Sequence, residues 1–290
     1  MITGLTEPMH TLNESTAMSE PTPSPVPRVH VVKQLPGEGA LAAQRPEPLR
    51  YAYTQTRVEP GIRARLLRMP LVVKGDNAEL SETFRLLRAQ VLPRMRADAH
   101  SVIAVTSPRR LHGKSLTALN LSLTLAADLD TSVLLLDAEL GGQGVQRLLG
   151  LHDEPGLAEH LTQDTALSNL LVNPGVERLV VLPAGARAPG NSSELLATRL
   201  TCRMVQDMKQ RYADRIVVVD LPPLLESADA LAFLPWADTT LVVAEEVASR
   251  VRDLETAAEL LAPFNLIGTV MSKAPVEKPA RRRRWFEPDA

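Results

Sequence analysis

A glycine, a lysine and a serine follow one another at Gly113, Lys114 and Ser115, after a short apolar run and before a stretch with a helical pattern. Backbone N–H groups at the start of a helix bind phosphate, a lysine reaches the β- and γ-phosphates of a nucleotide, and a hydroxyl binds Mg²⁺. The triplet alone is a weak signal, and its position between a buried strand and a helix strengthens it. The sequence therefore predicts a nucleotide phosphate site at these residues.

Two further apolar runs each end in a carboxylate, SVLLLD at Asp137 and RIVVVD at Asp220. Mg²⁺ prefers hard oxygen ligands and keeps several waters, so either aspartate suits it directly or through water. One of the two could also orient or deprotonate a hydroxyl nucleophile. The alternative is that each aspartate only caps the segment that follows. The occurrence of both after Lys114 and Ser115, in this order along the chain, favours a nucleotide site.

The elements that must position these groups alternate between strands and helices. Strands are expected at 101–106, 132–137, 177–184, 215–220, 239–245 and 266–272, and helices at 76–95, 114–128, 143–149, 156–171, 193–210, 227–234 and 250–262. Such alternation predicts an α/β fold, a parallel twisted sheet with helices on both faces. Continuous apolar strands are typical of this class, and the carboxyl ends of its strands form the usual ligand site.

The first part of the chain differs from the rest in composition. Ten of the 23 prolines fall within the first seventy residues, and no apolar periodicity is visible there. We expect a disordered, proline-rich extension at 1–72, acting as a tether or as a docking segment, then a nucleotide-binding domain at 73–274 and a basic tail at 275–290. The tail carries Arg281, Arg282, Arg283 and Arg284 followed by Trp285 and Phe286, and is either solvated or in peripheral contact with anionic lipid.

Composition excludes several other classes of protein. The chain has 290 residues, 44% of them hydrophobic and 3% aromatic, which suits a core of Leu, Val, Ile and Ala. The formal net charge of -2 gives no domain-wide basic surface, so nucleic-acid binding is not expected. The single Cys202 excludes an internal disulfide and suits a reducing cytosol, and neither a signal peptide nor an apolar stretch of about 20 residues is present. We expect a cytoplasmic protein.

An ordered series of motifs in residues 78–274 resembles the cytoplasmic domain of bacterial BY-type tyrosine kinases, and more narrowly the autokinases of exosortase-type exopolysaccharide loci. The series is Glu82-x-x-Arg85-x-x-Arg88, TSP…GKS (106–115), VLLLDAEL (133–140), LGLHDEPGLAEHL (149–161), VLPAG (181–185), SELLAT (193–198) and VVVDLPPLLESADA (217–230). ParA- and MinD-like P-loop ATPases share the general plan. The resemblance covers about two thirds of the chain.

The resemblance implies ATP and Mg²⁺, homo-oligomers, and a membrane partner, a Wzz-like polysaccharide co-polymerase that sets chain length. It assigns nucleotide binding to Gly113, Lys114, Ser115, Leu116 and Ser272, and Mg²⁺ to Ser115, Asp137 and Asp220. Lys114, Asp137 and Asp220 are the implied catalytic residues. The resemblance assigns oligomerisation to Glu82, Arg85 and Arg88; without it, these three form a solvated charged face with an i,i+3 ion pair.

Several positions depart from the family pattern. Leu111 replaces a loop glycine, and the neighbouring Arg109, Arg110 and His112 either offer charge to phosphate or are solvated. Glu139 replaces the second aspartate of Asp-x-Asp, and Ser272 replaces the asparagine that contacts adenine. The tyrosine-rich tail is missing, since the only tyrosines are Tyr51, Tyr53 and Tyr212, of which the first two are alternative acceptors.

Three functions therefore remain open. The first is an ATP-dependent tyrosine autokinase that supports exopolysaccharide synthesis and chain-length control. The second is a catalytically degenerate regulatory subunit of a polysaccharide co-polymerase, at the inner face of the cell membrane. The third is a ParA/MinD-like ATPase that positions cargo.

Overall fold

The computed structural model describes the chain from 28 to 272 with gaps. The described residues are 28–30, 57–58, 60–69, 71, 77–110, 113–141, 144–152, 154–186, 191–211, 214–245 and 249–272.

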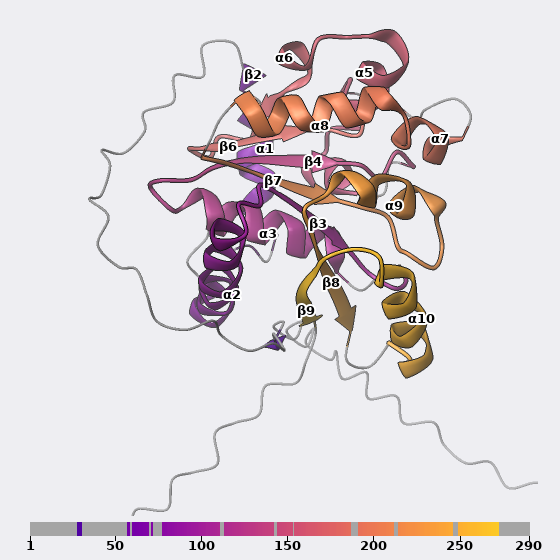
Figure 1. Cartoon of the computed structure of the whole chain (residues 1–290). Helices are drawn as coiled ribbons and strands as arrows, with labels where there is room; N and C mark the ends of the chain where they lie inside the picture. The colour runs from indigo at the N-terminus through magenta and orange to yellow at the C-terminus, as the bar shows by residue number, and fades with distance from the viewer. Residues whose placement is uncertain are drawn as a thin grey trace, which may run out of the picture.

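A twisted sheet runs through the centre of the protein (Figure 1). Its strands are β1 Arg28–His30, β2 Arg57–Val58, β3 Val102–Thr106, β4 Ser132–Asp137, β5 Val172–Asn173, β6 Leu179–Leu182, β7 Arg215–Asp220, β8 Thr239–Glu245 and β9 Leu266–Ser272. Their spatial order is β1-β9-β8-β3-β7-β4-β6-β5-β2. Neighbouring strands from β9 to β6 are parallel, which confirms the expected α/β class. The edges differ, because β1 is antiparallel to β9, and β5, which was not expected, is antiparallel to β6.

Helices cover both faces of this sheet (Figure 1). One face carries α1 Pro60–Leu66, α2 Ala78–Ala97, α3 Lys114–Ala126 and α4 Val145–Leu149. The other carries α5 Leu157–Gln163, α6 Leu167–Leu170, α7 Ser192–Leu196, α8 Arg199–Arg211, α9 Ala228–Phe233, the 3-10 turn η2 Leu234–Trp236 and α10 Val251–Leu261. None of the described helices combines the length and apolarity that crossing a membrane requires.

The strands are apolar without interruption because each of their faces is buried. In β3, Ile103 and Val105 join the core beneath α2 and α3, whereas Val102 and Ala104 join the core on the opposite face. All four are fully buried. This two-sided burial is the physical reason that the strands lack the alternation of a half-exposed sheet.

Two expected helices are divided by local backbone chemistry. The helix expected over 156–171 is wrong in extent, because Asp164 has a left-handed φ of 55° and ends α5, after which α6 starts separately. The helix expected over 193–210 is interrupted at Thr198, whose hydroxyl accepts a hydrogen bond from the Thr201 backbone N–H at 3.3 Å and so caps α8. Side-chain caps of this kind stop one helix and start another without breaking the apolar pattern.

The expected extension also needs correction near its end. Within 1–72, α1 is helical, and Ile62, Leu66 and Leu71 are only 3, 1 and 2% exposed in the core on the α2 and α3 face. Pro60 occupies the first position of α1, where a missing N–H costs nothing. Strands β1 and β2 also fall within this range and belong to the sheet. The remainder of 1–72, and the tail 275–290, lie outside the described residues.

Shortening Leu66 tests whether α1 is part of the folded core. We expect Leu66→Ala to lower the free energy of unfolding by about 2–4 kcal/mol, because it leaves a cavity in a packed core. The neighbouring Leu67 is 48% exposed, so Leu67→Ala is the matched control and is expected to change stability by less than about 0.5 kcal/mol. Urea denaturation measures both; equal, small effects would show that α1 does not pack as described.

Candidate nucleotide-binding site

The loop between β3 and α3 ends at a glycine that the geometry requires. Gly113 precedes the first residue of α3 with a φ of 79°, in the left-handed region that side chains disfavour. A Cβ at Gly113 would lie 3.8 Å from both Cβ and Oγ of Ser272, so the end of β9 lies beside this loop. Leu116 follows in the first turn of α3. Leu111, expected to replace a loop glycine, and His112, expected to offer charge to phosphate or to be solvated, lie outside the described residues.

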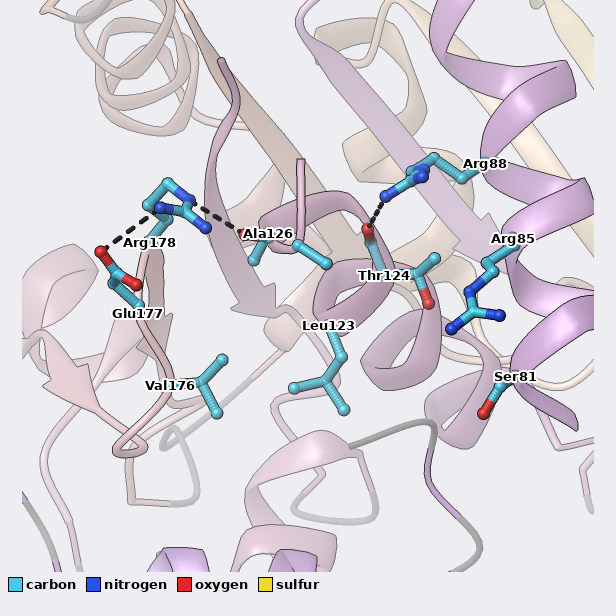
Figure 2. Close-up of a pocket in the computed structure, with 10 residues that line it drawn as sticks. Ser81, Arg85, Arg88, Leu123, Thr124, Ala126, Val176, Glu177 and Arg178 are labelled. Carbon is cyan, nitrogen blue, oxygen red and sulfur yellow. Dashed lines mark hydrogen bonds and ion pairs between the residues drawn. The ribbon is translucent and has the colours of Figure 1, made fainter. Parts of the chain in front are cut away.

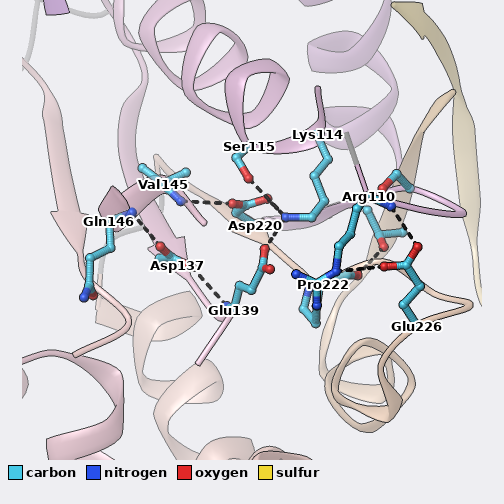
Figure 3. A network of polar contacts seen from close by, with 12 residues as sticks. Arg110, Lys114, Ser115, Asp137, Glu139, Val145, Gln146, Asp220, Pro222 and Glu226 are labelled. Atoms are coloured by element: carbon cyan, nitrogen blue, oxygen red, sulfur yellow. Dashed lines mark hydrogen bonds and ion pairs between the residues drawn. The ribbon is translucent and has the colours of Figure 1, made fainter. Parts of the chain in front are cut away.

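The side chain of Lys114 turns into the sheet edge and is buried among oxygen atoms (Figure 3). Its Nζ donates to the Ser115 hydroxyl at 3.1 Å and lies 3.5 Å from Oδ1 of Asp220. It also forms a close ion pair with Oε2 of Glu139. Burial would lower the pKa of Lys114, but the charges of Asp220 and Glu139 outweigh this, and the pKa is raised. The lysine is therefore a charged ammonium within its ion pairs.

The two strand-end aspartates lie opposite each other. Asp137 of β4 pairs in register with Asp220 of β7, and both side chains are completely buried. Oδ1 and Oδ2 of Asp137 accept backbone N–H bonds from Glu139 at 3.0 Å and from Gln146 at 2.6 Å. Oδ2 of Asp220 accepts the backbone N–H of Val145 at 3.2 Å. The start of α4 thus holds both carboxylates at one place.

Burial makes this carboxylate pair reluctant to ionise. Desolvation, and then the nearby charge of Asp220, raise the pKa of Asp137 to about 8, although its two backbone hydrogen bonds oppose the shift. The pKa of Asp220 is also raised, first by desolvation, with Lys114 and the Ser115 hydroxyl acting in the opposite direction. The pair therefore retains a proton near neutral pH when no divalent cation is bound.

The oxygen atoms at this edge fit a Mg²⁺ ion. Oδ1 of Asp220 is buried, accepts no hydrogen bond of normal geometry, and lies 3.5 Å from the Lys114 ammonium. Among the described residues, no group of three or more His, Cys, Asp or Glu side chains forms a metal cage. Mg²⁺ does not need one, since it is usually held by one or two carboxylates, waters and substrate phosphates.

Three contributors to the site were not anticipated. Glu139 was noted only as an altered acid, and the structure makes it the closest partner of Lys114. The backbone N–H groups of Val145 and Gln146 carry no side-chain signal, so sequence reasoning could not find them. The glycine at position 144 is a weak sequence signal that the backbone approaches another group closely there. In the structure, a Cβ at Gly144 would lie 2.3 Å from Oδ1 of Asp137, so the position tolerates no side chain.

Two arginines within the loop between β3 and α3 form ion pairs with acidic residues of neighbouring elements. Arg109 forms a two-pronged ion pair with Asp253 of α10, at 2.7 and 3.0 Å. Arg110 Nε donates to Glu226 at 2.9 Å. These pairs attach the loop to the elements that flank β7 and β8. The side chains of Arg109 and Arg110 are still 49% and 59% exposed, so they anchor the loop while remaining in contact with solvent.

The charged face of α2 borders a cavity of about 280 Å³ near the end of α3 (Figure 2). Arg85 forms an exposed i,i+3 pair with Glu82 at 3.4 Å. Arg88 instead donates to the backbone carbonyl of Thr124 at 3.0 Å, and Arg178 donates to that of Ala126 at 3.1 Å. Two arginines therefore cap the carboxyl end of α3, and Arg85 remains the more exposed of the α2 pair.

The raised pKa of Asp137 predicts a specific dependence of stability on pH. The pKa of Asp137 in the folded protein, about 8, exceeds its ordinary value of 3.8, so protonation of this carboxyl stabilises the ligand-free protein. This contribution is fully present below the ordinary pKa and is lost as pH rises through the folded pKa of about 8. We expect Asp137→Asn, which stays neutral, to gain stability relative to wild type between pH 5 and 9, by on the order of a few kcal/mol.

Urea denaturation at several pH values without divalent cations measures this difference. Asp207→Asn on the exposed surface of α8 is the control and should run parallel to wild type. If the wild-type and Asp137→Asn curves also run parallel, Asp137 is ionised in the folded protein and the described burial is incorrect.

Comparisons with known proteins concern the sequence and the fold as a whole. No family model matches the chain. The succinoglycan biosynthesis transport protein ExoP of Rhizobium meliloti is 30% identical over 208 residues, which is 70% of this chain and 26% of ExoP. The putative tyrosine-protein kinase CapB of Staphylococcus aureus is 25% identical over 212 residues, 72% of this chain and 91% of CapB.

The solved kinase domain of Escherichia coli tyrosine kinase ETK superposes with a TM-score of 0.65 at 24% identity, over 73% of this chain and 83% of that domain. The chain spans about a quarter of the length of ExoP and of the tyrosine-protein kinase ptk from Acinetobacter johnsonii. The sequence comparisons show that the chain is related to the bacterial BY-type tyrosine kinases, and the structural comparison shows that it has the P-loop architecture of their kinase domain.

Proposed function

We propose that this chain binds ATP with Mg²⁺ at the edge formed by β3, β4 and β7, and transfers the γ-phosphoryl group to tyrosine in support of exopolysaccharide synthesis and chain-length control. The observation that carries the proposal is the convergence of Lys114, Ser115, Asp137 and Asp220 within one buried cluster beside the start of α3. The names of the related proteins, which include tyrosine kinases and a succinoglycan transport protein, support the reaction and its setting.

Each residue has a role that follows from its chemistry. The backbone N–H groups at Gly113, Lys114, Ser115 and Leu116 face an anion at the positive end of the α3 dipole. Lys114 binds the β- and γ-phosphates, and Ser115 with Asp220 holds Mg²⁺, with Asp137 acting directly or through water. When bound, Mg²⁺ neutralises phosphate charge. Ser272, beside Gly113, borders the nucleotide at the end of β9.

One of the carboxylates also orients the tyrosine hydroxyl that attacks the phosphoryl group. The ionised form of Asp137 or of Asp220 would accept a hydrogen bond from the tyrosine hydroxyl. The chain has only three tyrosines, and Tyr51, Tyr53 and Tyr212 all lie outside the described residues. A partner protein, or Tyr51 and Tyr53, would supply the acceptor.

The proposed setting is the cytoplasmic face of the cell membrane, next to a Wzz-like polysaccharide co-polymerase. The face of α2 that carries Glu82, Arg85 and Arg88 would contact a second copy of the chain, since Glu82 and Arg85 are exposed there. The basic tail, which is outside the described residues, would add peripheral contact with lipid.

A second candidate is a regulatory subunit that binds nucleotide and has lost phosphoryl transfer. The close pairing of Glu139 with Lys114 favours it, because this glutamate departs from the aspartate of the family pattern that the chain resembles and ties up the phosphate-binding lysine. The scarcity of tyrosines points the same way. The relatives reported above bear the names of kinases and of a polysaccharide transport protein, which favours these two candidates over a positioning ATPase.

Incubation with Mg-ATP separates the two candidates. We expect wild-type protein to label a tyrosine, detected by phosphotyrosine antibody and mass spectrometry. Asp220→Asn should label it about 100-fold more slowly, since charge stabilisation near the phosphoryl group is lost.

ATP binding is measured separately by calorimetry. Lys114→Ala should weaken the affinity for ATP by about tenfold or more, whereas Lys209→Ala, which changes a lysine paired with Asp238 away from the site, should leave it unchanged. ATP binding without any label, on the protein or on partner proteins added to the reaction, would leave the regulatory subunit as the function.

The α2 face makes a separate prediction about assembly. Arg85→Ala should change the free energy of unfolding by less than about 0.5 kcal/mol, because its ion pair is exposed. Arg88→Ala should cost about 1–2 kcal/mol, because the Thr124 carbonyl loses a charged donor. If α2 joins protomers, light scattering will show that Arg85→Ala lowers the oligomer mass without unfolding the chain; an unchanged mass would remove Arg85 from the contact.

A further inference from the structure

The ammonium of Lys114 lies among the oxygen atoms that a divalent cation would use (Figure 3). Its Nζ is 3.1 Å from the Ser115 hydroxyl oxygen, 3.5 Å from Oδ1 of Asp220, and in contact with Oε2 of Glu139. The side chain of Lys114 is 10% exposed, and those of Glu139 and Asp220 are 7% and 0% exposed. A cation already occupies the place where the proposed function puts Mg²⁺.

We propose that Lys114 is the resident cation of the metal site in the nucleotide-free protein, held there by Glu139, so that a divalent cation enters only when nucleotide phosphate draws the lysine away. This inference rests on the proposed nucleotide site. Glu139 and Lys114 thereby make the binding of metal depend on the binding of nucleotide.

Electrostatics gives the reason for the exclusion. Two cations a few ångströms apart in a buried site repel each other strongly, because water screens them little there. Lys114 and Mg²⁺ would also compete for the same acceptors, Ser115 Oγ and Asp220 Oδ1. Because the lysine is covalently tethered, it acts as an intramolecular competitor and lowers the apparent affinity for a divalent cation by a constant factor. Divalent cations alone should therefore bind weakly to the wild-type protein.

Glu139 is placed to hold the lysine rather than to move with it. Its backbone N–H donates to Oδ1 of Asp137 at 3.0 Å, which fixes the chain two residues beyond the end of β4. Its carboxylate then reaches the ammonium directly. Nucleotide phosphates present several negative charges at the start of α3 and can outcompete a single carboxylate for Lys114. Once the lysine has moved, Ser115 and Asp220 are free for the metal.

This arrangement requires metal and nucleotide to bind cooperatively. By thermodynamic linkage, if bound nucleotide raises the affinity for metal by some factor, bound metal raises the affinity for nucleotide by the same factor. Wild-type protein should show this coupling, and a variant without the ammonium should lose the part of it that comes from lysine displacement.

Titration of Mn²⁺ into nucleotide-free protein tests the proposal, because Mn²⁺ accepts the same octahedral oxygen ligands as Mg²⁺ and its free form is measured by electron paramagnetic resonance. We expect Lys114→Met to bind Mn²⁺ at least about tenfold more tightly than wild type. Lys209→Met is the matched control, since Lys209 also pairs with a partly buried carboxylate, Asp238, and it should leave Mn²⁺ affinity unchanged.

Lys114→Met leaves carboxylates without a counter-ion, so its folding must be secured. The double variant Lys114→Met/Glu139→Gln removes both members of the ion pair and keeps Ser115, Asp137 and Asp220. It should retain the gain in Mn²⁺ affinity, with circular dichroism and chain mass as for wild type. Equal Mn²⁺ affinity in wild type and in both Lys114 variants would overturn the proposal.

A parallel calorimetric titration with ATP in excess Mg²⁺ separates this inference from the proposed function. If wild type binds no ATP but Lys114→Met still gains Mn²⁺ affinity, the lysine is the resident cation and the proposed function fails. If ATP binds and Mn²⁺ alone binds wild type as tightly as Lys114→Met, the proposed function stands and the resident-cation inference fails.

Discussion

The burial of one ammonium with three carboxyl groups, at the edge where β3, β4 and β7 end, is the constraint on which the rest of the structure depends. Counted over the whole residue, Lys114, Glu139, Asp137 and Asp220 are 8, 5, 0 and 0% exposed. Ionised groups removed from water to this extent are stable only when each has a partner or a proton. The ion pairs of Lys114 and the raised pKa of Asp137 satisfy that requirement in two different ways. Both depend on the strands delivering the acids to the same level, which their register does by placing Asp137 opposite Asp220.

The backbone does as much as the side chains in holding this cluster. Amides of Glu139, just after β4, and of Val145 and Gln146, at the start of α4, donate to the two aspartates, so these two segments form a fixed array of N–H dipoles. The side chain of Gln146 then exchanges hydrogen bonds with the backbone of Gly185, at 2.7 and 3.0 Å, and so ties the turn after β6 to the same place. On the other side, the ion pair of Arg109 with Asp253 connects the phosphate loop to α10. The site is thus held from several elements that lie far apart in the sequence.

The parts of this arrangement that sequence could predict are those that a local pattern encodes. The runs SVLLLD and RIVVVD gave strands with the bounds expected, because residues buried on both faces must be apolar throughout. Gly113, Lys114 and Ser115 could be placed at a helix start for a similar local reason. The partnership of Glu139 with Lys114 could not, since it joins residues 25 positions apart and depends on how β3 and β4 are ordered across β7. The packing of Ile62 and Leu66 was missed because a seven-residue helix has too few apolar positions to stand out within a proline-rich stretch.

The position of α1 has a consequence for how the domain can be cut. Helix α1 packs beside α4, and Arg65 lies so close to Gly150 at the end of α4 that a Cβ there would be 2.2 Å from its Nη1. The other end of α4 supplies the amides that hold Asp137 and Asp220. A fragment trimmed to begin at residue 73, where composition places the boundary, would strip α4 of its outer support. Such a fragment could retain every recognisable motif and still loosen the acidic pair at its centre. Functional studies of the isolated domain therefore need to start upstream of Pro60.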